Sequence, residues 1–144
     1  MPYATGIALA FLTALLARAV GLDRDRALYP SLLMVIASYY VLFAVMGEST
    51  HAVLIESVVT IAFVLLAVTG FRLSLWVVVA MLAGHGAFDL VHPLLITNAG
   101  VPVWWPAFCL AFDVTLALCV AGLLWRGTIP ARRPEPTSTI TPPR

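Results

Sequence analysis

The sequence contains no lysine, and only 10% of its 144 residues are charged. Soluble domains carry about a quarter charged residues, so this scarcity excludes an ordinary soluble domain. Every basic residue is arginine and the net charge is only +1, which leaves no basic patch suited to nucleic acid. Cysteine is equally scarce. Cys109 and Cys119 are ten residues apart, which on one helix is about 15 Å, too far for a disulfide between them.

Hydrophobic residues make up 62% of the chain and the mean hydropathy is +1.01, values that indicate an integral membrane protein. One helix needs roughly 20 apolar residues to cross the hydrocarbon core. Apolar runs bounded by Arg, Pro and Gly residues predict five helices, at residues 3–21, 30–47, 51–70, 73–97 and 106–125. Short connections favour one compact all-α bundle over residues 1–125. The first helix lacks signal-peptide features and is expected to be retained, and residues 126–144 predict a disordered Pro-rich tail.

The arginines predict an orientation because cytoplasmic loops carry an excess of Lys and Arg. All eight arginines lie in or next to the first connection, the third connection or the tail: Arg18, Arg24, Arg26, Arg72, Arg126, Arg132, Arg133 and Arg144. The second and fourth connections contain none. This distribution predicts an N-terminus outside the membrane and a C-terminus in the cytoplasm.

Five acidic or histidine residues lie well inside the predicted spans: Glu56, His85, Asp89, His92 and Asp113. Measured by the helical rise from the outer ends of their own helices, Glu56 and His92 lie about 8 Å deep. Asp113 lies about 10 Å deep, Asp89 about 12 Å and His85 about 18 Å. The i, i+4, i+7 spacing puts His85, Asp89 and His92 on one helix face. A charge in hydrocarbon costs about 2.5 to 3.5 kcal/mol, so we expect these groups to meet inside the bundle.

Two kinds of functional site fit these residues. In one, all five are candidate metal ligands, and mixed imidazole and carboxylate ligation suits zinc or iron. Asp89 and Glu56 are then the candidate catalytic residues, since a carboxylate outside the metal's shell can act as a general base. In the other, the same groups relay a proton or cation. A purely structural clamp between helices is the third interpretation, and the sequence leaves all three open.

Two neighbouring features are given smaller roles. Cys109, at i and i+4 with Asp113, is a minor ligand candidate, and Tyr40 is expected to pack in the bundle with a hydrogen-bonded hydroxyl. The connection before residue 106 either folds over the outer mouth of the site as a lid or anchors its Trp pair at the interface.

The combined pattern resembles a family of small bacterial integral membrane proteins that is defined by a domain of unknown function. The pattern consists of Glu56, the H-x3-D-x2-H run from His85 to His92, Asn98, a Pro-containing loop, and the C-x3-D run from Cys109 to Asp113. The resemblance covers residues 50–120 and implies a bacterial cytoplasmic membrane protein with a site at these residues. One departure is Pro93, which stands where relatives have a further His. A looser similarity to membrane hydrolases such as alkaline ceramidases, which have more helices, is an analogy only.

The leading hypothesis from the sequence is therefore a membrane metalloenzyme that acts on a lipid or another apolar small molecule. The alternatives are a small transporter or proton- or cation-relay subunit, and a structural membrane partner protein. The absence of an internal repeat disfavours transport by a monomer. Membrane lipids and an apolar small molecule are the expected partners, and a homo-oligomer is left open.

Overall fold

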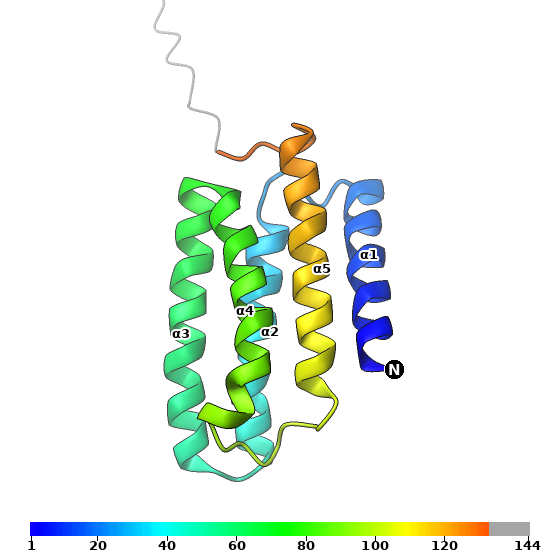
Figure 1. The fold of residues 1–144 in the computed structure, drawn as a ribbon. Coiled ribbons are helices and arrows are strands. Elements are labelled where there is room, and N and C mark those ends of the chain that lie inside the picture. Colours follow the sequence, from blue (N-terminus) through cyan, green and yellow to red (C-terminus); the bar gives the residue numbers. More distant parts are fainter. Residues whose placement is uncertain (133–144) are drawn as a thin grey trace, which may run out of the picture.

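The structure is a computed structural model that describes residues 1–132, and these residues form an all-helical bundle without strands (Figure 1). The helices are α1 (Pro2–Val20), α2 (Leu28–Met46), α3 (Thr50–Leu73), α4 (Leu75–Leu95) and α5 (Trp105–Trp125). All five are long and apolar enough to span a membrane. The predicted all-α class and the five predicted apolar helices are confirmed, with shifts of at most three residues at their ends.

Local side-chain signals explain the largest of these shifts. Ser74 is extended, ends α3, and its Oγ caps α4 by accepting a hydrogen bond from the Trp76 N–H at 3.3 Å. A single residue therefore separates α3 from α4, and α3 continues past its predicted end at residue 70. At the end of α1, Gly21 adopts a φ of 83°, the left-handed conformation that glycine tolerates best.

The helices are arranged around α5, which packs against α1 on one side and α4 on the other, while α3 packs against α2 and α4 (Figure 1). The buried face of α1 contains only small residues: Gly6, Ala10, Ala14 and Ala17. A Cβ at Gly6 would lie 2.5 Å from the carbonyl oxygen of Phe108 on α5. Small residues thus allow the backbones of α1 and α5 to approach closely, as is common between membrane helices.

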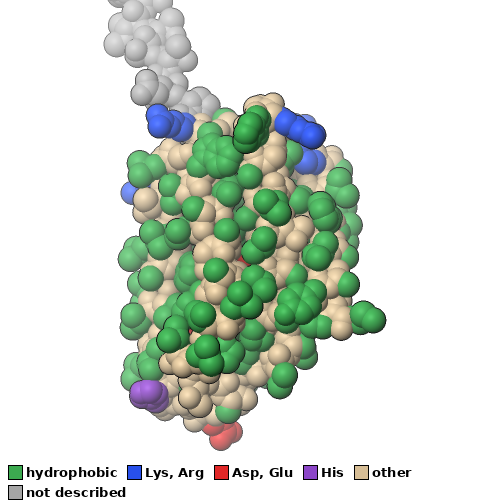
Figure 2. Space-filling view, viewed as in Figure 1, with side chains coloured by type: hydrophobic (Ala, Val, Ile, Leu, Met, Phe, Trp, Pro, Cys, Tyr) green, Lys and Arg blue, Asp and Glu red, His purple; other side chains and the backbone are tan. Residues whose placement is uncertain are grey.

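The bundle has an arginine end and an opposite end. The arginine end comprises the connections α1–α2 and α3–α4 together with residues 126–132, and Figure 2 shows arginine side chains gathered there above apolar sides. Residues 126–132 pack against this end. Ile129 is buried, and the carbonyl oxygen of Ala131 accepts hydrogen bonds from Leu75 N and Arg26 Nη2, both at 2.9 Å. The rest of the predicted tail, residues 133–144, lies outside the described residues.

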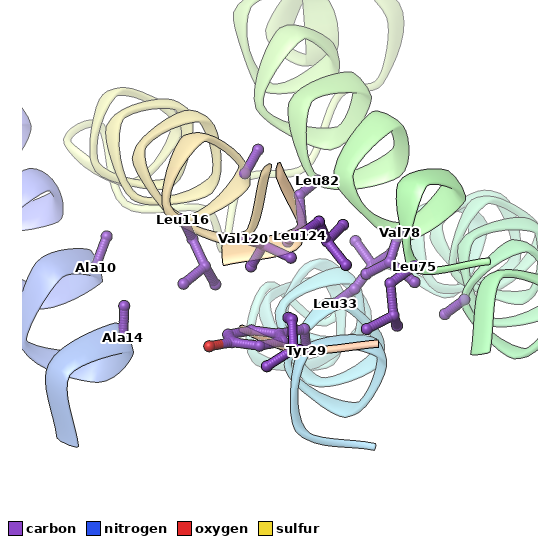
Figure 3. Close-up of a cluster of buried hydrophobic side chains, with 13 residues drawn as sticks. Ala10, Ala14, Tyr29, Leu33, Leu75, Val78, Leu82, Leu116, Val120 and Leu124 are labelled. Atoms are coloured by element: carbon purple, nitrogen blue, oxygen red, sulfur yellow. The ribbon is translucent and has the colours of Figure 1, made fainter. Parts of the chain in front are cut away.

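Figure 3 shows a cluster of buried apolar side chains, and its members on α2, α4 and α5 come from the half of each helix nearest the arginine end. We call this group the apolar core; its labelled members are Ala10, Ala14, Tyr29, Leu33, Leu75, Val78, Leu82, Leu116, Val120 and Leu124. Large apolar side chains such as Leu15, Val58 and Leu94 also cover the outside of the bundle. Such a continuous apolar surface is expected of a protein surrounded by lipid.

Candidate functional site

The buried face of α4 changes from apolar to polar partway along the helix. It begins with Leu75, Val78 and Leu82 and continues with His85, Asp89 and His92. On α5 the same change separates Leu116 from Asp113, because α5 runs in the opposite direction. The half of the bundle away from the arginine end therefore has a polar interior. This confirms the predicted shared face of α4.

All five ionisable residues that the sequence predicts as a site are buried, with exposed fractions of 0 to 1%. Three of them form a compact group between α4 and α5, which we call the triad: His85, Asp89 and Asp113. His85 Nδ1 is hydrogen-bonded to Asp113 Oδ2 at 2.7 Å and lies 3.5 Å from Asp89 Oδ2. One ligand atom from each triad residue lies within 4.8 Å of the others.

Gly86 allows α4 and α5 to approach closely enough for the triad to form. A Cβ at this position would lie 3.3 Å from both the Asp113 Cβ and the carbonyl oxygen of Leu110, and 3.2 Å from a methyl group of Val114. These contacts are tighter than ordinary van der Waals packing. A larger residue at position 86 would therefore push α5 away from His85.

The other two predicted residues form a separate group, the His92–Glu56 pair. His92 Nε2 is hydrogen-bonded to Glu56 Oε1 at 2.7 Å. Asn98 Nδ2 donates to the same Glu56 oxygen at 2.9 Å and to the backbone carbonyl of Tyr40 at 3.0 Å. The sequence treats all five residues as one ligand set, whereas the structure divides them into the triad and this pair.

The division arises because α5 begins deeper in the bundle than the rise-based estimate assumes. That estimate puts Asp113 level with His92, at about 10 and 8 Å, and far from His85 at about 18 Å. In Figure 1, α4 extends beyond the start of α5, and residues 96–104 fold back between them. Asp113 consequently meets His85, and His92 meets Glu56 on α3.

Tyr40 on α2 connects the two groups. Its hydroxyl donates to Asp89 Oδ1 at 2.6 Å, and its ring lies on the His92 ring with the centroids 4.0 Å apart. The side chain is 2% exposed. The sequence predicts a hydrogen-bonded hydroxyl here, yet it assigns Tyr40 no place in the site. The available signal is its position in the middle of a span, at the level of the polar residues on other helices.

Three buried carboxylate oxygens have no hydrogen-bond partner: Glu56 Oε2, Asp89 Oδ2 and Asp113 Oδ1. A buried polar atom without a partner costs about 1 to 3 kcal/mol. The arginines within residues 1–132 all lie at the other end of the bundle and do not compensate these carboxylates. Protons, imidazolium groups or a bound cation must therefore offset the negative charge.

A cavity of about 360 Å³ adjoins the site at the end of the bundle opposite the arginines. Its lining includes His92 and Asn98, together with residues of the α4–α5 connection. That connection is held tightly against α2, because a Cβ on Gly100 would overlap the carbonyl oxygen of Phe43. The connection thus covers this end of the polar interior. The cavity reaches the His92–Glu56 pair through His92.

Cys109, the minor ligand candidate, is 2% exposed and one helical turn from Asp113. It does not belong to the group whose ligand atoms lie within 4.8 Å of one another in the described part of the chain. Both cysteines are free thiols, which agrees with the prediction that they do not pair.

Comparisons with known proteins found no match: no family model matches the chain, and no curated protein or solved structure is significantly similar to it. The resemblance to small bacterial integral membrane proteins therefore stays a prediction. The five apolar helices and the His/Asp/Asp group are the observations on which a functional proposal can rest.

Proposed function

We propose that this protein is a multi-pass membrane protein that binds a divalent metal ion at His85, Asp89 and Asp113. The observation that carries the proposal is the triad itself, three fully buried ligand atoms from two helices within 4.8 Å of one another. Tetrahedral zinc with bonds of about 2.0 to 2.1 Å holds its ligand atoms about 3.4 Å apart. The 3.5 Å between His85 Nδ1 and Asp89 Oδ2 already fits. The 2.7 Å contact with Asp113 must widen by about 0.7 Å as the metal replaces the hydrogen bond.

Charge supports a divalent ion. Two carboxylates and a neutral imidazole carry a charge of −2, which one divalent cation cancels. An imidazolium at His92 would likewise cancel the carboxylate of Glu56, 2.7 Å away. Every buried charge in the polar half then has a counterpart without any arginine. Zinc and iron are the metals that mixed imidazole and carboxylate ligation favours.

The proposed role is that of a metalloenzyme acting on a lipid or another apolar small molecule. Three protein ligands leave a coordination position open, and a metal there would polarise a carbonyl or phosphoryl oxygen of the substrate. Glu56 and His92 lie between the triad and the cavity, where they can accept and return a proton. Asp89, a catalytic candidate from the sequence, is better assigned as a metal ligand. Tyr40 would orient it.

A proton or cation relay is the second candidate, because hydrogen bonds and close polar contacts run from Asp113 through His85 and Asp89 to Tyr40. A relay across the membrane would also have to pass the apolar core, which fills the arginine half. Among the described residues, the apolar core contains no carboxylate, imidazole or guanidinium group, and its Tyr29 hydroxyl has no hydrogen-bond partner. The metal site is therefore the better supported proposal.

We further propose that the arginine end faces the cytoplasm, with the N-terminus outside, in a bacterial cytoplasmic membrane. The support is the gathering of arginines at one end, since basic residues favour the cytoplasmic side. The cavity and the His92–Glu56 pair would then lie nearer the outer surface. A substrate would enter from that side.

Metal analysis of the detergent-purified protein tests the function. We expect about one zinc or iron per chain in the wild type, and loss of the metal in Asp89→Asn and Asp113→Asn. Glu48→Gln, at an exposed residue near the same end, is the matched control and should keep the metal. His92→Ala should also keep it, because His92 belongs to the pair rather than the triad.

Circular dichroism of each variant shows whether its helices are retained, which separates loss of a ligand from loss of the fold. A wild type that neither carries metal nor binds added zinc or iron would refute the proposal. Metal loss in His92→Ala equal to that in Asp89→Asn would instead indicate a ligand set that spans both groups.

A further inference from the structure

A groove of about 340 Å³ lies along α1 and α5, at the opposite end of the bundle from the polar site. Phe11 and Leu15 of α1 and Leu118 and Leu123 of α5 contribute its apolar lining. Ala14, Cys119 and Gly122 are the small residues among the lining. The space in front of Gly122 is open, since a Cβ there would meet no atom within 4 Å.

Arg18 and Arg126 also line this groove. Each lies at or just beyond the last turn of its helix, where the chain leaves the membrane-spanning segment. From Phe11 to Arg18 the helical rise is about 10 Å, so the apolar part of the groove runs about that far from the arginines into the bundle's flank.

Arg18 is held in place while keeping donors free. Its Nη1 donates to both oxygens of Asp23, at 3.3 and 3.2 Å, and Asp23 is fully buried. The other guanidinium N–H groups are not used by this pair. Arg126 is exposed, and its side chain forms no ion pair or hydrogen bond within the described residues. The groove thus ends in one oriented guanidinium and one without a partner.

We propose that this groove binds one anionic phospholipid, with an acyl chain along α1 and α5 and the phosphate between Arg18 and Arg126. Guanidinium groups match phosphate oxygens in charge and geometry, and they lie where lipid headgroups begin. The proposal is independent of the metal site, which lies in the other half of the bundle.

A second copy of the chain is a poorer occupant of the same groove. Two copies that share the membrane orientation and meet through this face would bring the arginines of both to the same end of the interface. Like charges placed together oppose association. An anionic headgroup, by contrast, compensates Arg126, since Arg18 is already paired with Asp23 and contributes its remaining N–H donors.

The test is to titrate phosphatidylglycerol or phosphatidylcholine into the detergent-solubilised full chain and count bound lipids by native mass spectrometry. The first phosphatidylglycerol should bind the wild type about fivefold more tightly than phosphatidylcholine, the effect of one basic side chain near an anionic headgroup. Arg126→Gln should remove this preference and leave phosphatidylcholine binding unchanged. Arg72→Gln, an arginine at the same end but on α3, is the matched control and should keep it.

Gly122→Leu tests the groove without changing charge. Its side chain would fill open space, and leucine favours helix over glycine, so the fold should be retained while both lipids bind more weakly. The proposal is overturned if Arg126→Gln keeps the preference or if Arg72→Gln loses as much of it. Displacement by inorganic phosphate would also overturn it by indicating a free-anion site. A dimer that Gly122→Leu disrupts would also overturn the proposal, because it would show that a second copy of the chain occupies the groove.

Discussion

Replacing Tyr40 by phenylalanine removes one hydroxyl and leaves the aromatic ring, and so tests whether Tyr40 supports the triad. The hydroxyl donates to Asp89 Oδ1 at 2.6 Å, while Asp89 Oδ2 has no hydrogen-bond partner. Tyr40→Phe therefore leaves a fully buried carboxyl with no hydrogen bond at either oxygen. Such a group costs about 1 to 3 kcal/mol in water-soluble proteins, and polar contacts between membrane helices reach about 1.7 kcal/mol. We expect Tyr40→Phe to destabilise the protein by about 1 to 2 kcal/mol.

The same change should weaken metal binding by about 10- to 100-fold, the usual loss when a residue that orients a ligand is removed. The ring of Phe can still lie on the His92 ring, so the packing of α2 should persist. Unfolding in detergent micelles and calorimetric titration with zinc measure the two effects separately. Tyr39→Phe is the matched control, because Tyr39 is 36% exposed and packs against Trp105 outside the site.

Metal affinity within twofold of wild type in Tyr40→Phe would refute the reasoning that Tyr40 orients a metal ligand. If stability fell by the expected amount while metal affinity did not change, the hydroxyl would be a structural clamp between α2 and α4. An equal effect of Tyr39→Phe on both measurements would show that neither depends on the Asp89 hydrogen bond.

Two further predictions concern the covering connection and the orientation. Gly100→Ala should displace the connection from Phe43, break the hydrogen bond of Asn98 to Glu56 and so lower thermal stability. Gly84→Ala is the matched control, because a Cβ at Gly84 meets no atom within 4 Å; it should leave stability unchanged or raise it by up to about 1 kcal/mol. Thermal unfolding of both variants in detergent checks this, and equal stability of the two would contradict it. A reporter enzyme that works only in the cytoplasm should be active when fused to the C-terminus, and one that works only outside should be inactive there. The opposite result would contradict the proposed orientation.

The helices could be predicted from the sequence because hydrophobic length alone largely determines a membrane span. Five apolar runs become five helices, and the largest shift of a helix end occurs next to Ser74, where capping chemistry decides. Which helices pack together is a different matter. The placement of α1 against α5 depends on the small residues of its buried face and on their fit to Phe108, a contact between distant parts of the chain.

The polar residues of the site could also be predicted, because ionisable groups are costly in hydrocarbon and must face inward. Their grouping could not be. Pairing His85 with Asp113 requires the starting level of α5, which the fold of residues 96–104 determines. Tyr40 and Asn98 escape a search for charge because they are neutral, although their hydrogen bonds to Asp89 and Glu56 hold both groups in place.

The division of the bundle into an apolar and a polar half bears on the kind of function proposed. A conducting pathway needs a chain of polar groups on both sides of its central site, whereas the apolar core on the arginine side offers the Tyr29 hydroxyl alone among its side chains, without a hydrogen-bond partner. The polar half has a cavity at its far end and partnerless carboxylate oxygens in its interior. An enzyme site that its substrate enters from one side of the membrane needs only such an arrangement. The apolar core then acts as the packed base against which α4 and α5 hold the triad in place.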